Sequence, residues 1–95
     1  MPMKKKDEIP QGKNELTLTI EQIMKDFGGT KYKNYTTEAF LTEVNGRLDA
    51  CAIIAKGPVK VLTANLKRRI AKKKTVEDIL MELNETLFAF FEGGQ

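Results

Sequence analysis

The amino-acid sequence predicts one α+β domain, in which two or more helices pack on a small mixed sheet. Residues 15–20 alternate apolar and polar side chains, which is typical of a strand, and residues 49–57 form a continuous apolar run. Other stretches repeat their apolar residues at helical spacing. A length of 95 residues fits a single domain. We therefore expect an arm at residues 1–14 and one two-layer domain at residues 15–95.

The first elements follow from these patterns. Residues 1–14 predict a flexible basic arm, because charged residues, proline and glycine leave little that could be buried. The lysines at positions 4–6 could contact a polyanion from this arm. The alternating stretch predicts a strand at 15–19 that runs into a short helix at 20–27, which two glycines end.

The middle of the chain predicts a helix, a strand and a second helix in turn. Thr36 or Thr37 can cap a helix that stops at the Asn-Gly pair of positions 45–46. The apolar run 49–57 then predicts a strand that is covered on both faces. A helix follows at 58–73, since its proline suits a first helical turn and the apolar residues after it share one face.

The acidic tail supports two interpretations. Residues 75–83 have a threonine cap and apolar residues at helical spacing, whereas the aromatic-rich residues 86–91 suit a strand. Phe88 would be exposed on a helix and buried in a central strand, and the buried position is the one expected. The predicted core is drawn from all these elements: Leu16, Leu18, Phe40, Leu41, Val44, Ile53, Ile54, Leu62, Leu66, Ile70, Leu80, Leu83 and Phe90.

The residue types argue against an enzyme. The chain has no histidine, the commonest general base and metal ligand. Its single cysteine, Cys51, cannot form an internal disulfide, and we expect it to be a small core residue in a reducing compartment. The glycines form neither a phosphate-binding loop nor a dinucleotide fingerprint, and no pair of carboxylates stands out. We expect no catalysis, no cofactor and no metal.

The sequence carries no pattern of membrane insertion or secretion. No apolar run approaches the roughly 18 residues that a membrane helix needs, and the start of the chain lacks the apolar core of a signal peptide. We therefore expect a cytoplasmic protein, or one associated with the nucleoid or nucleus, that has no membrane partner.

Charge is segregated along the chain. Residues 1–55 carry eight basic and eight acidic groups, residues 56–74 carry eight basic groups and no acid, and residues 75–95 carry five acids and no base. Clustered Lys and Arg bind DNA or RNA by releasing counterions, so the basic segment predicts a nucleic-acid partner. A membrane surface, an acidic protein or the simple solvation of a helix face would also explain the charge.

A short loop adds to the basic segment. In the sequence TKYKNY, Lys31 and Lys33 alternate with Tyr32 and Tyr35. Lysines reach phosphates, and tyrosines can stack on bases. We expect Tyr35 to pack beneath the next helix, whereas the position of Tyr32 suits stacking and chance exposure equally.

The stretch NYTTEAFLTEVNGRLDACAIIAKG, residues 34–57, resembles the Alba family of archaeal chromatin proteins and its relatives in RNase P and RNase MRP. In that family pattern a lysine-rich loop precedes a helix that carries a tyrosine and stops at Asn/Gln-Gly. An apolar strand and a turn similar to AKG follow, and a second helix then starts directly. The resemblance covers residues 31–70.

The resemblance implies an Alba-like two-layer sandwich that is usually dimeric and binds DNA or RNA with little base specificity and no cofactor. It also implies that Lys31 and Lys33 grip the phosphate backbone, with Lys56 and Lys60 beside them. The chain departs from the family pattern in the helix-like stretch before the loop, in Pro58 after the second strand, and in an acidic tail that replaces a basic arm.

The sequence therefore predicts a non-catalytic protein that grips the phosphate backbone of DNA or RNA with a basic loop and a basic amphipathic helix. The two nucleic acids are not distinguished, and a homodimer or heterodimer is expected. The alternative is a protein-interaction module, or a small regulatory subunit, that uses the apolar acidic tail. The candidate nucleic-acid-binding residues are Lys31, Tyr32, Lys33, Lys56, Lys60, Lys67, Arg68, Lys72 and Lys73.

Overall fold

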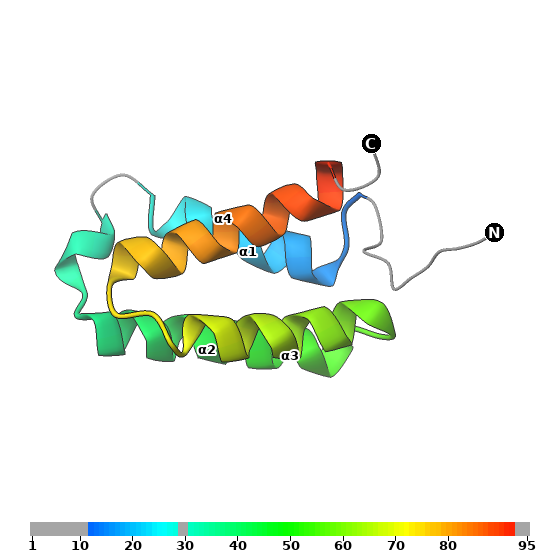
Figure 1. Ribbon diagram of the computed structural model, residues 1–95, viewed down its shortest axis with the longest axis horizontal. Coiled ribbons are helices and arrows are strands. Elements are labelled where there is room, and N and C mark those ends of the chain that lie inside the picture. Colours follow the sequence, from blue (N-terminus) through cyan, green and yellow to red (C-terminus); the bar gives the residue numbers. More distant parts are fainter. Residues whose placement is uncertain (1–11, 29–30, 93–95) are drawn as a thin grey trace.

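The computed structural model describes residues 12–28 and 31–92, and its regular structure there is helical (Figure 1). No strand occurs within these two ranges, so the expected α+β sandwich with a small mixed sheet is wrong. The four α-helices, with one short 3₁₀ turn between the first two, are α1 (Glu15–Asp26), η1 (Lys31–Asn34), α2 (Thr37–Ile54), α3 (Pro58–Ile70) and α4 (Val76–Glu92).

The four helices form an up-and-down bundle in which each helix runs antiparallel to the next (Figure 1). Residues 55–57 join α2 to α3, and residues 71–75 join α3 to α4. Such short connections leave consecutive helices as antiparallel neighbours. Helix α4 also packs on α1, which closes the bundle and places α3 diagonally opposite α1.

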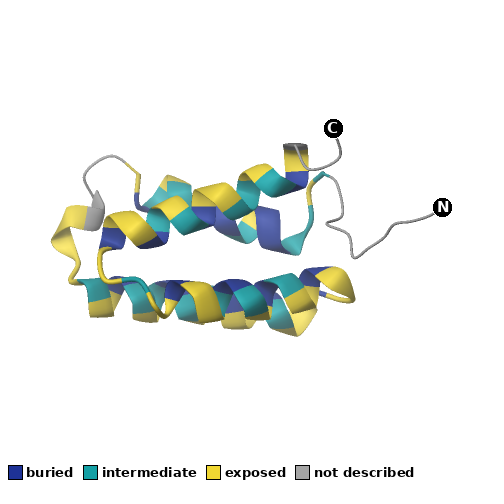
Figure 2. Cartoon of the chain, viewed as in Figure 1, coloured by how far each residue is buried: buried dark blue, intermediate teal, exposed yellow. Residues whose placement is uncertain are grey.

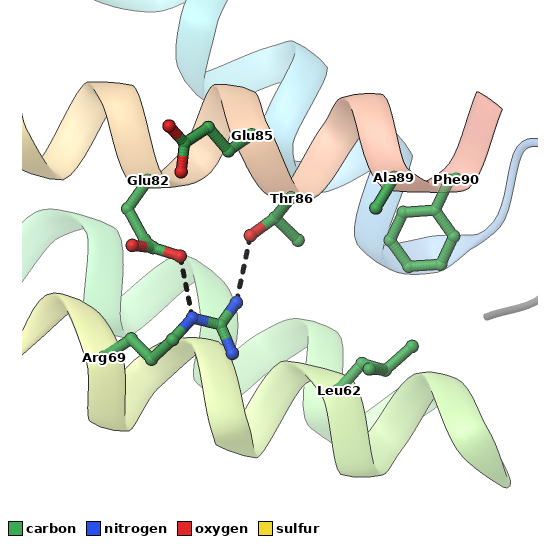
Figure 3. A pocket seen from close by; sticks show the side chains of 7 residues that line it. All are labelled: Leu62, Arg69, Glu82, Glu85, Thr86, Ala89 and Phe90. Atoms are coloured by element: carbon green, nitrogen blue, oxygen red, sulfur yellow. Dashed lines mark hydrogen bonds and ion pairs between the residues drawn. The ribbon is translucent and has the colours of Figure 1, made fainter. Parts of the chain in front are cut away.

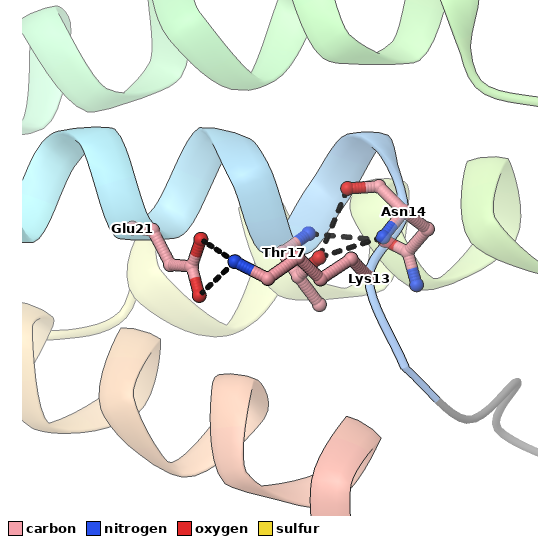
Figure 4. Close-up of polar contacts among 4 residues, drawn as sticks. All are labelled: Lys13, Asn14, Thr17 and Glu21. Atoms are coloured by element: carbon pink, nitrogen blue, oxygen red, sulfur yellow. Dashed lines mark hydrogen bonds and ion pairs between the residues drawn. The ribbon is translucent and has the colours of Figure 1, made fainter.

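Helix α1 begins five residues before the expected helix because Asn14 caps it (Figure 4). The Asn14 Oδ1 atom accepts hydrogen bonds from the backbone N–H groups of Leu16 at 2.9 Å and Thr17 at 3.0 Å, and the Asn14 N–H donates to Thr17 Oγ1 at 2.7 Å. The strand expected at 15–19 is therefore wrong. Leu16 and Ile20 lie four residues apart on the buried side of the helix, whereas Leu18, at 54% exposure, points to solvent.

Helix α2 continues through the Asn-Gly pair where we expected it to stop. Gly46 faces open space on the outside of the helix, so it lowers helix propensity without ending the helix. The run 49–57 is accordingly the last part of this helix and the turn after it, and the expected strand is wrong. Its Cys51 is buried as expected, but Ile53 is 81% exposed, because one side of the helix faces solvent.

Helix α3 is the element that the sequence predicted best. It starts at Pro58 as expected and ends at Ile70, three residues before the expected end. Gly57 precedes it with a φ of +58°, a conformation that favours glycine. The sharp turn at Gly57 directs α3 back along α2.

The acidic tail is a single helix rather than a helix followed by a strand. The Thr75 Oγ1 atom accepts a hydrogen bond from the Asp78 N–H at 3.1 Å, which caps α4 as the sequence indicated. The strand at 86–91 does not form, and Phe88 is 52% exposed on the helix. The expectation that Phe88 is buried is therefore wrong.

The core lies between the four helices (Figure 2). Most predicted core residues are buried or partly buried, but Leu18, Ile53 and Ile54 are exposed because their elements are helices. Leu48 and Ile79 are fully buried without having been predicted. The buried apolar residues are Leu16, Ile20, Ile23, Phe27, Phe40, Val44, Leu48, Cys51, Ala55, Val59, Leu66, Ile70, Val76, Ile79, Leu83 and Phe90.

The end of the expected arm is attached to the bundle. The Gly12 N–H donates to the Phe90 carbonyl oxygen at 2.9 Å, and Lys13 Nζ lies 3.2 Å from Glu21 Oε1 (Figure 4). The rest of the arm, including the lysines at 4–6, lies outside the described residues.

Candidate nucleic-acid interface

The solvent-facing side of α3 and its following turn is basic. Lys60, Arg68 and Lys72 are exposed there and are separated by small or apolar side chains. At about 1.5 Å per helical residue, Lys60 and Arg68 lie roughly 12 Å apart along the helix axis, and Lys72 follows in the turn after α3. No carboxylate belongs to this surface among the described residues. We call this surface the α3 outer face; it consists of Lys60, Val61, Ala64, Arg68, Ala71 and Lys72.

A shallow hollow lies toward the end of the α3 outer face. It has a volume of about 470 Å³, and its lining includes Arg68, Arg69 and Lys72. Arg68 donates a hydrogen bond to the side chain of Asn65, a neutral partner that leaves the charge of the guanidinium uncompensated. A phosphate group in this hollow would meet Arg68 and Lys72, whereas the charge of Arg69 is already paired with Glu82.

The candidate residues at the two borders of α3 are paired within the chain. Lys67 forms an ion pair with Asp49 of α2. Lys73 Nζ lies 3.4 Å from Glu82 Oε1 of α4. These two lysines were expected to bind phosphate with the others, but their charges already serve contacts between helices.

Arg69, which was not among the candidates, pairs with the same carboxylate (Figure 3). Its Nε donates to Glu82 Oε2 at 2.7 Å, and its Nη2 donates to Thr86 Oγ1 at 3.1 Å. Partial burial alone would raise the pKa of Glu82. Its pKa instead lies below the ordinary 4.5, because Arg69 and Lys73 both donate hydrogen bonds to the carboxylate and stabilise its negative charge.

The basic loop lies at the same end of the bundle as the turn after α3. Thr37 Oγ1 donates to the Lys74 carbonyl oxygen at 3.4 Å, and Lys33 lines a hollow together with Thr75. Because Lys33 is exposed, it adds a positive charge at the end of the bundle where Lys72 lies. The side chains of Lys31 and Tyr32 are not among those that the structure describes, so their roles stay predictions.

Tyr35 contacts the bundle but is 39% exposed, so it lies against the bundle rather than beneath the next helix. Its ring lies edge-on to Phe27, with 5.1 Å between the ring centroids, and 6.3 Å from the ring of Phe40 at the start of α2. These contacts fix the loop to α1 and α2 and make Tyr35 a structural residue.

The candidate residues thus do not form one compact site. Lys56 and Lys60 are exposed at the start of α3, while Lys33, Lys72 and Lys73 lie at the opposite end of the bundle. The α3 outer face connects the two ends.

Helix α4 carries the opposite charge. Its described side chains include Glu77, Asp78, Glu82 and Glu85 and no basic residue. Met81 and Phe88 lie seven residues apart on its outer side and are 59% and 52% exposed. These two exposed side chains are the largest apolar groups on the outer side of α4 between Glu77 and Phe88. Of these two residues, only Phe88 is marked in the sequence, by its position off the helical stripe.

The described residues offer no group of three or more His, Cys, Asp or Glu side chains that could hold a metal ion. Cys51 is buried, and its Sγ lies 3.7 Å from Thr63 Oγ1.

Arg47 links α1 to α2. A hydrogen bond to Asp26 at 2.7 Å raises the pKa of Arg47 above its ordinary value, although burial opposes this.

No protein-family model, curated protein or solved structure matches this chain. The resemblance to the Alba family implied a sandwich that contains a sheet, and the helical bundle contradicts that Alba-like fold. The roles that the resemblance gave to Lys31, Lys33, Lys56 and Lys60 therefore depend on charge alone. In the parts of the chain that the structure describes, no helix is both long and apolar enough to span a bilayer.

Proposed function

We propose that this protein binds the phosphate backbone of DNA or RNA through the α3 outer face, without catalysis. The observation that carries the proposal is the unpaired positive charge of this face. Lys60, Arg68 and Lys72 are exposed along one helix, and none of them pairs with a carboxylate among the described residues. Binding would release counterions from the nucleic acid and would be nearly independent of sequence.

The shape of the surface agrees with this proposal. The α3 outer face is hollowed beside Arg68 and Lys72, and Ala64 and Ala71 are small enough for a sugar-phosphate chain to approach closely. The α3 outer face itself carries no Asn, Gln, Asp or Glu that could pair with a base edge, and the amide of Asn65 beside it accepts a hydrogen bond from Arg68. We therefore expect contacts to phosphates rather than to bases.

Fluorescence anisotropy tests the proposal. Labelled duplex DNA, single-stranded DNA and a stem-loop RNA are titrated with the protein at about 50 and 200 mM salt, a range over which phosphate-driven binding weakens steeply. We expect binding at the lower salt concentration that is strongly reduced at the higher one, and the ranking of the probes selects DNA or RNA. Absence of binding at the lower concentration would contradict the proposal.

A second candidate function is binding to another protein through α4. It is favoured by the exposure of Met81 and Phe88 on a helix that carries only acidic charges. A surface of this kind fits a partner that combines apolar and basic residues. The two functions use different helices and can coexist.

A further inference from the structure

Helices α3 and α4 present a joint face with opposite charges on its two sides. The two helices are antiparallel neighbours, and Arg69 of α3 spans the seam between them by donating to Glu82 and Thr86 of α4 (Figure 3). These two bonds fix which residues of α3 and α4 lie at the same height along the bundle.

Each side of the seam carries one sign of charge. On α3, the exposed Arg68 and Lys72 lie beside Arg69 around one hollow. On α4, Glu85 lies beside Arg69 at a second hollow of about 220 Å³, and Asp78 is exposed two turns earlier. The seam therefore separates a basic stripe from an acidic one.

Exposed apolar side chains accompany both stripes. Val61 on α3 is 60% exposed, and Met81 and Phe88 on α4 are exposed to a similar degree. A surface that combines large apolar side chains with both signs of charge is suited to a specific contact.

The arrangement of the charges selects the occupant. Two copies that met through α4 alone would bring carboxylates together, and two copies that met through α3 alone would bring cations together. Like-charge contacts of this kind are unfavourable. A second copy related by a two-fold axis parallel to the helices instead places α3 of one copy over α4 of the other.

This symmetry preserves the height of every residue along the bundle. Since Arg69 is level with Glu82 and Thr86, its neighbour Arg68 would lie opposite Glu85 of the second copy. Lys72, four residues further in the turn after α3, would lie about level with Met81, one helical turn from Asp78. Every contact would occur twice, as in an isologous interface.

We propose that the joint α3/α4 face binds a second copy of this chain, with the basic stripe of each copy on the acidic stripe of the other. The apolar side chains Val61, Met81 and Phe88 are covered in the same contact. The interface does not depend on the proposed function. It has one consequence for that function, because Arg68 and Lys72 cannot contact a second copy and a phosphate backbone at once.

Sedimentation velocity of the full chain without nucleic acid, over a range of protein concentrations at low salt, tests the proposal. We expect a monomer–dimer equilibrium in the wild-type chain. The variants Arg68→Glu and Glu85→Lys should each weaken the dimer by about tenfold or more, because each places like charges opposite one another. The double variant restores opposite charges and should recover the wild-type dissociation constant to within about threefold.

Circular dichroism of each variant establishes whether it is folded. If one single variant does not fold, the other single variant and the double variant still decide the test. A wild-type chain that stays monomeric at every concentration would overturn the proposal. A dimer that neither single substitution weakens, or that the double variant does not recover, would place the contact elsewhere. The nucleic-acid titrations are made separately, so the failure of one proposal is distinguishable from the failure of the other.

Discussion

The Nε atom of Arg69, in the last turn of α3, donates a 2.7 Å hydrogen bond to Glu82 in the middle of α4. The carboxylate is the more buried partner, and Lys73 approaches its other oxygen at 3.4 Å. The Glu82 carboxylate thus pairs with two basic residues, Arg69 and Lys73, which lie four positions apart in the sequence. This contact connects the basic helix to the acidic helix and removes two charges from the surface available to a polyanion.

The lowered pKa of Glu82 makes its contribution to stability depend on pH. A carboxyl group whose pKa is lower in the folded than in the unfolded chain stabilises the fold above the unfolded value, and this stabilisation is lost as the pH falls through the folded value. We expect Glu82→Gln to reduce the free energy of unfolding by about 0.5–1 kcal/mol at neutral pH, since the partners are partly exposed. The difference should shrink as the pH falls below 4.5.

Urea unfolding followed by circular dichroism at a series of pH values measures this difference. Glu77→Gln is the matched control, because Glu77 is exposed and lies in the first turn of the same helix. A difference between wild type and Glu82→Gln that stays constant down to the lowest pH would contradict the assigned ion pair.

Two glycines should respond to the same substitution with opposite signs. Gly57 has a φ of +58°, so Gly57→Ala forces alanine into a left-handed conformation and should destabilise the protein by about 1–2 kcal/mol. Gly46 lies inside α2 with open space where a Cβ would be, so Gly46→Ala should stabilise by about 0.5–1 kcal/mol. Thermal unfolding of both variants compares them directly, and destabilisation by Gly46→Ala would mean that α2 does not continue through this position.

Two isoleucines test the burial that the bundle assigns to them, and Ile53 also distinguishes the bundle from the expected sandwich. Ile79 is fully buried, and Ile79→Ala should cost about 2–5 kcal/mol of stability. Ile53 is 81% exposed, and Ile53→Ala should change stability by no more than about 0.5 kcal/mol. Denaturant unfolding gives both values. A large cost at Ile53 would show that this side of α2 is covered.

Arg68 and Lys67 are neighbours in the sequence, but we expect them to contribute unequally to nucleic-acid binding. Arg68 has a neutral partner, whereas Lys67 pairs with Asp49. We expect Arg68→Gln to weaken nucleic-acid binding several-fold more than Lys67→Gln, because the charge of Lys67 is compensated before binding. Anisotropy titrations at low salt measure both affinities, and an equal loss would show that Asp49 releases Lys67 on binding.

The sequence predicted those elements whose signals agreed with one another. Pro58, the 3.6-residue repeat after it and the basic last turn all indicate one helix, and α3 forms where expected. At 15–20 the strand pattern and the helix pattern coexist. Leu16 and Ile20 lie four positions apart, a spacing that puts both on one side of a strand and on one side of a helix. Asn14 favours the helix through its capping bonds, a signal that the alternating pattern does not contain.

The candidate site was predictable in part for the same reason. The basic face of α3 follows from the local helical pattern, and its exposure is what the structure shows. The contacts of Lys67 with Asp49 and of Lys73 with Glu82 join residues far apart in the sequence. They depend on which helices become neighbours, and no local pattern contains that information.

The most direct test of the account is the salt dependence of nucleic-acid binding by two single variants of equal net charge. Arg68→Ala removes a cation from the α3 outer face, whereas Lys25→Ala removes an exposed cation on the diagonally opposite helix α1 that pairs with no carboxylate among the described residues. We expect the first variant to lower the slope of log K against log salt by about 0.9 and to weaken binding, and the second to change the slope little. Equal effects of the two variants, or an unchanged slope in the first, would show that the α3 outer face does not bind the phosphate backbone.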